Sequence, residues 1–351
     1  MRGPSVVMPL LWRRLGLGCV LALAGLAGLT RAATPGAAPA ACPPVAEAPT
    51  PEAMPQLARQ ARDRGLLWRV EQGGHTSWLY GTLHAAERGW VVPGPTVMQA
   101  LRSADRLALE LNVLDPAVLA ALQSALQARA DAPPLPADLA HRLAAQVKAA
   151  CLDDDTARLR PDAQVLTLVT LAGRSEGLDP AYGIDLWLAA LSSSLGKPVL
   201  ALETPERQIR ELVSDDPEQV ASTVRNGLDQ LERGDAGQQL ATLAHAWADG
   251  RLQLLETYPA WCDCMQTPAE RADYDRLVAG RNPGMAAALV AEHRAGRSVF
   301  AAVGALHMVG PQGLPALLAA QGFRVERVHF PQARPARGTR QEFKSKGPPA
   351  Q

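Results

Sequence analysis

The stretch SVFAAVGALHMVG, residues 298–310, decides the fold. Its run of small apolar residues is typical of a buried strand. The run stops at Gly304 and presents His307 three residues later. Glycine permits a positive φ or a close backbone approach, which is the geometry needed to turn a side chain into a cleft at a strand end. The pattern therefore predicts a core strand that ends by delivering an imidazole.

The same form occurs near the other end of the chain. The stretch WLYGTLH, residues 78–84, also places Gly-x-x-His after an apolar run and so delivers His84. Residues 77–111 and 299–330 share one order of strand, Gly-x-x-His, Gly-Pro loop, helix and strand. We interpret them as two copies of a βαβ unit, each a right-handed crossover onto a parallel strand. Because ligands bind beyond the carboxyl ends of parallel strands, we expect His84 and His307 within a few Å of each other in one cleft.

The predicted strands gather at the two ends of the chain. Residues 66–84 predict a β-hairpin, because Gly73-Gly74 separates two runs with aromatic and β-branched residues. From about residue 115 to 296 the pattern is helical, with proline and aspartate at the helix starts. The sequence thus predicts an α/β fold tending to α+β. Its sheet comes from two pseudo-repeated βαβ units at the chain ends, with a large helical insertion between them, in a single domain of residues 57–332.

The segments outside this domain carry different signals. Residues 1–32 have the charged, apolar and small-residue layout of a secretory signal peptide, with cleavage expected after Ala32. Their apolar core is shorter than the ~20 residues that span a bilayer, and no later segment is long and apolar enough. Residues 33–56 predict an Ala- and Pro-rich arm, and residues 333–351 a disordered tail. We therefore expect a periplasmic or secreted protein without a transmembrane span in the mature chain.

The balance of charge says little for a polyanionic partner. The chain carries 35 Lys and Arg against 35 Asp and Glu, so its formal net charge is zero. The charges are interspersed along the sequence rather than clustered in basic patches. We therefore expect no nucleic-acid partner, and the sequence carries no signal for the oligomeric state.

The cysteines that remain after cleavage are Cys42, Cys151, Cys262 and Cys264. An even number in an exported chain favours disulfides. Cys262 and Cys264 stand too close in sequence to bridge each other comfortably, so each is expected to pair with one of the two distant cysteines. A zinc site built on the CDC triplet is the alternative. It is disfavoured because Cys42 and Cys151 lack paired spacing.

Other charged and polar residues are candidates for the same cleft. Glu110 and Glu203 each end a predicted strand, which places both carboxylates beside the histidines if the sheet is parallel; strand alternation alone would let either face solvent. Asp185 stands near a helix start, where a carboxylate also complements the helix dipole. Asn282 is explained as a helix cap, whereas Arg281 has no local reason for its position.

These motifs together resemble the TraB/PrgY/GumN family, which is related to the Tiki metalloproteases. The resemblance covers residues 66–330 and rests on the order of Gly81-x-x-His84, Glu110, YGID at 182–185, LET at 202–204, Arg281-Asn282 and Gly304-x-x-His307. Tiki proteins are membrane-associated, metal-dependent peptidases. This chain departs from them because it lacks a transmembrane anchor.

The resemblance implies a metal-dependent hydrolase that acts on a peptide or protein substrate. Manganese or cobalt is the implied ion, and zinc is also compatible. The implied metal ligands are His84, His307, Glu110, Asp185 and Glu203, the last two either as ligands or as groups that hold the ligands. Glu110 would serve as ligand or general base. Arg281 would stabilise developing oxyanion charge, with Asn282 supporting the site from behind.

Two other readings stay open from the sequence. In a metal-independent hydrolase similar to the erythromycin esterases, a histidine would activate water directly. In a non-enzymatic protein, the chain would act on a partner or bind haem, as in the related ChaN-type proteins. Haem is disfavoured because the chain holds only four Phe and four Tyr to form an aromatic pocket. The pattern favours an enzyme.

Overall fold

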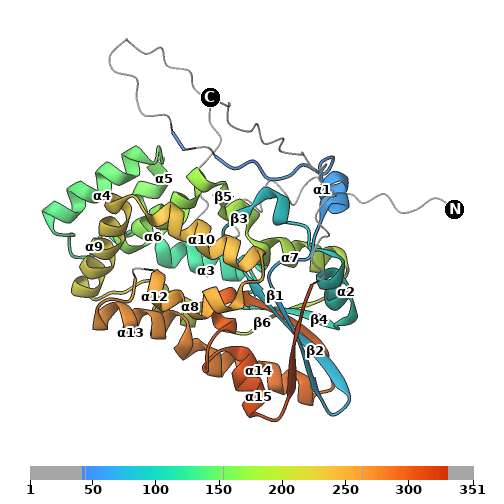
Figure 1. The fold of residues 1–351 in the computed structure, drawn as a ribbon. Coiled ribbons are helices and arrows are strands. Elements are labelled where there is room, and N and C mark those ends of the chain that lie inside the picture. The colour runs from blue at the N-terminus through green and yellow to red at the C-terminus, as the bar shows by residue number, and fades with distance from the viewer. Residues whose placement is uncertain (1–41, 44, 153, 263, 331–351) are drawn as a thin grey trace, which may run out of the picture.

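The computed structural model describes residues 42–43, 45–152, 154–262 and 264–330 (Figure 1). The expected signal peptide, with its cleavage site after Ala32, lies outside the described residues. The expected disordered tail and the first part of the Ala- and Pro-rich arm lie outside them too.

A six-stranded mixed sheet forms the centre of the fold, with strand order β6-β4-β7-β2-β1-β8. Its strands are β1 (Leu66–Gln72), β2 (His75–Thr82), β4 (Arg106–Leu109), β6 (Val199–Ala201), β7 (Val299–Gly304) and β8 (Arg324–Val328). Strands β6, β4, β7 and β2 run parallel to one another, and β1 is antiparallel to both β2 and β8. The α/β fold class predicted from the sequence is confirmed.

The hairpin between β1 and β2 forms as predicted. Gly73 and Gly74 both have positive φ, at 60° and 82°, and Gln72 pairs with His75 across the turn. A two-residue turn of this kind needs positive φ at both central positions, which glycine supplies at no steric cost. The turn therefore sets the register of β1 against β2.

The two predicted βαβ units are both present, but they are interleaved. The first runs from β2 through α2 (Pro95–Ser103) to β4, and β7 lies between its two strands. The second runs from β7 through α15 (Leu314–Ala320) to β8, and β2 and β1 lie between its strands. Each unit thus contributes one strand to the adjacent parallel pair β2–β7. Both Gly-x-x-His loops consequently leave the same edge of the sheet.

The predicted helical insertion fills the chain between β4 and β7 and is interrupted by two short strands, β6 and β5 (Leu178–Asp179). Strand β5 pairs with β3 (Ala86–Glu87), which lies before the insertion, between β2 and α2. The helices of the insertion are α3 (Pro116–Leu126), α4 (Ala137–Ala149), α5 (Asp154–Ala157), α6 (Pro161–Leu171), α7 (Ile184–Ser194), α8 (Pro205–Leu212), α9 (Pro217–Arg233), α10 (Ala236–Ala248), α11 (Leu252–Glu256), α12 (Tyr258–Trp261), α13 (Pro268–Leu277) and α14 (Asn282–Arg294). Prolines at the starts of most of them, and side-chain caps such as Asp115, explain where they begin.

The insertion has a small core of its own beside the main one. Helices α4, α6 and α9 bury an apolar cluster between them and form a helical lobe away from the sheet (Figure 1). Its members are Leu139, Leu143, Val165, Leu168, Val224 and Leu228. Helices α14 and α15 pack together against the sheet instead. The main core includes every residue of β7 from Val299 to Val303.

One indole connects the insertion to the end of β2. Trp247 of α10 is buried, and its Nε1–H donates to the carbonyl oxygen of Gly81 at 2.6 Å. The contact fixes the backbone three residues before His84, because a buried carbonyl needs such a donor.

In the described part of the chain, no helix has the length and apolar character needed to cross a membrane.

The expected disulfide pairing is wrong. The structure pairs Cys42 with Cys151, at a Cα–Cα distance of 5.6 Å, and Cys262 with Cys264, at 5.1 Å. Cysteines separated by one residue do reach each other here, because 5.1 Å lies within the ~4.4–6.8 Å that a disulfide requires. The distant pair joins the N-terminal arm to the C-terminal side of α4.

The two disulfides should stabilise the fold to different extents. The Cys42–Cys151 bond closes a loop with a sequence separation of 109, whereas the Cys262–Cys264 separation is only 2. Because a crosslink restricts the unfolded chain more when its loop is longer, Cys42→Ser with Cys151→Ser should lower the free energy of unfolding by about 2–4 kcal/mol. Cys262→Ser with Cys264→Ser is the matched control and should cost clearly less. Denaturant unfolding checks the difference; equal losses, or peptide mapping that links Cys42 to Cys262 or Cys264, would contradict the pairing.

Candidate functional site

The two Gly-x-x-His loops meet at Gly304. A Cβ atom at this position would lie 3.5 Å from Cδ2 of His307, 3.9 Å from Nε2 of His84 and 3.4 Å from Oε1 of Glu110. The structure thus brings together two imidazoles that stand more than 200 residues apart in sequence. The carboxylate of Glu110, which follows a third parallel strand, β4, lies beside them.

Gly304 serves close approach rather than an unusual backbone conformation. Its φ is −47°, which any residue adopts. Its backbone N–H donates to Oε1 of Glu110 at 2.9 Å, and the space a side chain would occupy is the space between the three functional groups. A larger residue here would fill the site itself.

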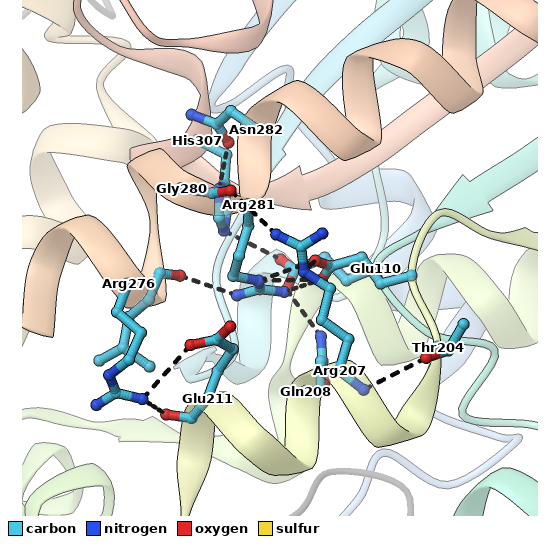
Figure 2. A network of polar contacts seen from close by, with 12 residues as sticks. Glu110, Thr204, Arg207, Gln208, Glu211, Arg276, Gly280, Arg281, Asn282 and His307 are labelled. Atoms are coloured by element: carbon cyan, nitrogen blue, oxygen red, sulfur yellow. Dashed lines mark hydrogen bonds and ion pairs between the residues drawn. The ribbon is translucent and has the colours of Figure 1, made fainter.

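His307 is held in one orientation by Asn282. Its Nδ1 lies 2.7 Å from Oδ1 of Asn282, and Nδ2 of the same amide donates to the carbonyl oxygen of Gln312 at 2.7 Å. Because this amide uses its NH₂ on Gln312, its oxygen accepts from His307, so the imidazole carries its proton on Nδ1. The lone pair on Nε2 then faces Glu110, whose Oε1 is 3.8 Å away (Figure 2). Burial lowers the pKa of His307 and favours this neutral form.

His84 is held in the same manner by Asp185 but lies in a wetter place. Its Nδ1 lies 3.2 Å from Oδ1 of Asp185, its side chain is 59% exposed, and it lines the cavity described below. The charge of Asp185 raises the pKa of His84 to about 9, although desolvation of the imidazole by the surrounding protein acts in the opposite direction. In the neutral form the Nδ1–H donates to Asp185 and Nε2 faces the point beside Gly304.

The YGID turn places Asp185 beside His84 through backbone contacts. The N–H of Ile184 donates to the carbonyl oxygen of Leu83 at 2.8 Å. A Cβ on Gly183 would lie only 2.7 Å from the carbonyl oxygen of His84, so glycine permits the two segments to touch. The start of α7 is consequently fixed against the His84 loop, and Asp185 stands in its first turn.

Arg281 lies between the two predicted carboxylates, Glu110 and Glu203. Figure 2 shows its contact with Glu110. Its Nη2 donates to Oε2 of Glu110 at 2.5 Å, and its Nε donates to Glu203 at 3.2 and 3.0 Å. Burial opposes the ionisation of Glu110, but the charges that His307 and His84 carry when protonated, together with that of Arg281, outweigh it and hold the pKa of this carboxyl below its usual range. Glu110 is therefore an anion at neutral pH.

Two residues of α8 also belong to this network, and the sequence did not single them out. Arg207 places its Nε 3.3 Å from Oε1 of Glu203 and donates to the carbonyl oxygen of Gly280 at 3.0 Å. Gln208 donates to Oε2 of Glu110 at 3.2 Å. The spacing of Arg207 four residues after Glu203 is a signal for an ion pair. Nothing in the sequence around Gln208 indicates its contact.

A cavity of about 280 Å³ opens beside this network. Its polar end holds His84, Glu110, Asp185, Gln208 and Arg281. The remainder is almost wholly apolar and is lined from β4, α3, α6 and α8 and by neighbouring loops. His307 and Glu203 are buried behind the polar end, so the cavity meets Glu110 and His84 first.

The donor set at Gly304 fits a divalent ion in its chemistry. The imidazole of His84 borders this point through Nε2, that of His307 through Cδ2, and Glu110 through Oε1, and each imidazole is oriented through its Nδ1. Nε2 of His307 lies 3.8 Å from Oε1 of Glu110. Asp185 accepts from His84, and Glu203 pairs with Arg281 and Arg207. Within the described ranges, no group of three or more His, Cys, Asp and Glu side chains has the spacing of a formed metal site.

The comparison with known families agrees with the resemblance seen in the sequence. Residues 66–327 match the model of the TraB/PrgY/gumN family, and the chain belongs to that family. The match spans both βαβ units and the whole helical insertion. Neither the curated proteins nor the solved structures gave a match.

The pKa of His84 provides a direct check on the Asp185 contact. In metal-free protein, the imidazole should titrate near the value of about 9, and Asp185→Asn should return it towards the ordinary 6.5 because the main source of the shift is removed. A raised pKa means that the pair stabilises the fold fully below about pH 6.5 and that this contribution is lost as the pH rises through about 9. Histidine NMR titration measures the pKa of His84 in the wild type and in Asp185→Asn. An unchanged pKa in Asp185→Asn would contradict the assignment.

The two histidines should differ in their contribution to stability. The side chain of His307 is only 5% exposed and bonded to Asn282, whereas that of His84 is 59% exposed. His307→Ala leaves a buried gap and an unsatisfied amide, so it should cost about 2–4 kcal/mol of unfolding free energy. His84→Ala should cost less than about 1 kcal/mol, as expected for an exposed side chain. Denaturant unfolding of metal-free protein measures both, and equal costs would show that the burial is misassigned.

Proposed function

We propose that this member of the TraB/PrgY/gumN family is an exported, metal-dependent hydrolase that cleaves peptide bonds. One observation carries the proposal. Two imidazoles converge on one point beside an ionised carboxylate, and each has its Nδ1 engaged by a fixed acceptor, Asp185 for His84 and Asn282 for His307. Histidines that bind metals are commonly oriented in this way, because a hydrogen bond at Nδ1 fixes the ring so that the lone pair of Nε2 points at the ion.

The proposal divides the candidate residues by what they touch. The ion would be held by Nε2 of His84, Nε2 of His307 and Oε1 of Glu110. Asp185 and Asn282 orient the imidazoles. Manganese or cobalt suits these mixed nitrogen and oxygen donors, and zinc does as well. Such an ion, when bound, polarises a carbonyl group and lowers the pKa of bound water.

Glu203 keeps the charge of Arg281 in place rather than binding the ion. Arg281 is tied to Glu203 through Nε and to the carbonyl oxygen of Leu277 through Nη1 at 3.0 Å, so its position is set before any substrate enters. A fixed guanidinium beside the cavity stabilises negative charge that develops on a substrate oxygen. Because nearby charges hold the pKa of Glu110 low, this carboxylate is a weak proton acceptor near neutral pH. The ligand role of Glu110 is therefore favoured over that of general base.

Export is part of the proposal because the described chain contains two disulfides. Such bonds form and persist in oxidising compartments. The layout of residues 1–32 is that of a secretory signal peptide. Sequencing the N-terminus of protein recovered from the periplasm or the medium tests this point. A first residue near Ala33 supports it, and full-length protein in the cytoplasm contradicts it.

A metal-independent hydrolase is the second candidate, and one contact favours it. The Asp185–His84 pair stands at the cavity with most of its imidazole accessible, and in its neutral form this is the arrangement of a histidine base oriented by a carboxylate. The two candidates differ in their response to chelation, because removing a metal leaves this pair intact.

Metal dependence is tested with a peptide library on the purified mature protein. Chelation should abolish cleavage, and added Mn²⁺ or Co²⁺ should restore it, while elemental analysis reports the native ion and the visible spectrum reports haem. His84→Ala, His307→Ala and Glu110→Gln should each lower the cleavage rate by at least about 100-fold. His75→Ala removes an exposed histidine of the hairpin turn and is the matched control. Full activity in EDTA would select the metal-independent candidate, and a Soret band with no cleavage would reject both.

The role of Asn282 is separable from catalysis by measuring metal affinity. Asn282→Ala removes the acceptor that orients His307, so the affinity of the protein for Mn²⁺ should fall by about 10–100-fold. Titration calorimetry measures this affinity without any substrate. Asn226→Ala, at an exposed site on α9, is the control and should leave the affinity unchanged. Equal affinities for wild type and Asn282→Ala would remove Asn282 from the site.

A further inference from the structure

The cavity extends from the polar site into an apolar pocket whose wall comes from the helical insertion. This pocket is lined by Leu122 and Leu126 of α3, Ala163 and Leu166 of α6, and Leu212 of α8. It is continuous with the space that borders His84 and Glu110, so a molecule bound in it reaches the functional groups directly.

The few polar residues beside the pocket are engaged elsewhere. The hydroxyl of Thr170 donates to the carbonyl oxygen of Leu166 in its own helix at 2.8 Å. The carboxylate of Glu211 faces Arg276 of α13, with Nη1 to Oε2 at 3.6 Å. Gln208 is bonded to Glu110. The pocket therefore offers an occupant apolar contact on its walls and polar contact only at the end where His84, Glu110 and Arg281 stand.

The size of the pocket limits what fits. An engineered apolar cavity of ~150 Å³ accommodates benzene, so about 280 Å³ holds one large side chain together with the carbonyl group that reacts at the polar end. A long acyl chain, with more than twice the carbon atoms of benzene, exceeds this space. A charged side chain would lose its hydration along the apolar wall, where the one charged lining residue, Glu211, already faces Arg276.

We infer that the pocket selects substrates with a large apolar side chain, of the leucine or phenylalanine class, next to the bond that is cleaved. The inference rests on the proposed function, since it assigns the specificity of that same site. The residues at the polar end carry out the reaction, and the helical insertion selects the side chain next to the cleaved bond. Burial of apolar surface in such a pocket stabilises binding roughly in proportion to the area removed from water.

Binding to metal-free protein tests the pocket apart from the chemistry. N-acetyl-phenylalaninamide and N-acetyl-leucinamide should bind at least about tenfold more tightly than N-acetyl-glycinamide and N-acetyl-lysinamide, as discrimination by an apolar pocket allows. Chemical-shift titration or calorimetry measures the four affinities. Equal affinities, or preference for the lysine amide, would overturn the inference.

Variants of the pocket wall locate the binding. Leu166→Ala removes apolar surface from the wall, and Ala163→Leu adds a side chain that fills the pocket. Both should weaken the binding of the phenylalanine amide by about fivefold or more and leave the affinity for the glycine amide unchanged. Leu195→Ala, at a leucine that is 37% exposed at the end of α7, is the matched control. Circular dichroism verifies the fold of each variant. If Ala163→Leu does not fold, Leu166→Ala carries the test, and an unchanged preference in it would overturn the assignment.

Cleavage of the peptide library by metal-loaded protein then separates the two proposals. A large apolar residue on one side of every cut supports the inference. Metal-dependent cleavage without such a preference would overturn the inference and keep the proposed function. Selective binding of the apolar amides without cleavage in any metal would overturn the proposed function and keep the pocket.

Discussion

The buried guanidinium of Arg281, shared by Glu110 and Glu203, is the interaction on which the site depends. Two carboxylates follow adjacent parallel strands, and burying them side by side without a cation would disfavour ionisation of both. Arg281 comes from the far end of the helical insertion, just before α14, and its contacts join that end to the sheet. Removing one partner of such a buried group leaves an uncompensated charge, which is why the network acts as a unit.

The ionic network also explains why two similar loops yield two different histidines. His307 lies behind the cavity, where burial lowers its pKa, and its acceptor is the neutral amide of Asn282. His84 lies at the cavity, where the carboxylate of Asp185 raises its pKa. The same Gly-x-x-His motif therefore presents one neutral and one readily protonated imidazole to a single anion, Glu110. The difference comes from the helical insertion, because Asp185 and Asn282 both belong to it.

Local patterns were sufficient to predict the strands, the hairpin, most helix starts and the edge of the sheet where the histidines emerge. What the sequence did not show depends on contacts between distant segments. The interleaving of the two βαβ units is set by which strands pair in space. The contact of Gln208 with Glu110 needs α8, which packs on α3 and α13, to lie beside the end of β4, and no spacing in the sequence encodes this. The cysteine pairing failed because proximity in sequence was taken to prevent a bond that the local backbone permits between Cys262 and Cys264.

In the proposed function, the groups that react and the wall that selects the substrate come from different parts of the fold. The duplicated units of the sheet contribute His84, Glu110 and His307, all at the carboxyl ends of parallel strands, where their mutual positions follow from strand pairing. The insertion contributes the groups that orient them and the apolar wall from α3, α6 and α8. Strand pairing tolerates little variation, whereas a helical wall accepts apolar substitutions of similar volume. If the proposed function holds, changes in the insertion would therefore alter which side chain is accepted while the sheet keeps His84, Glu110 and His307 in place.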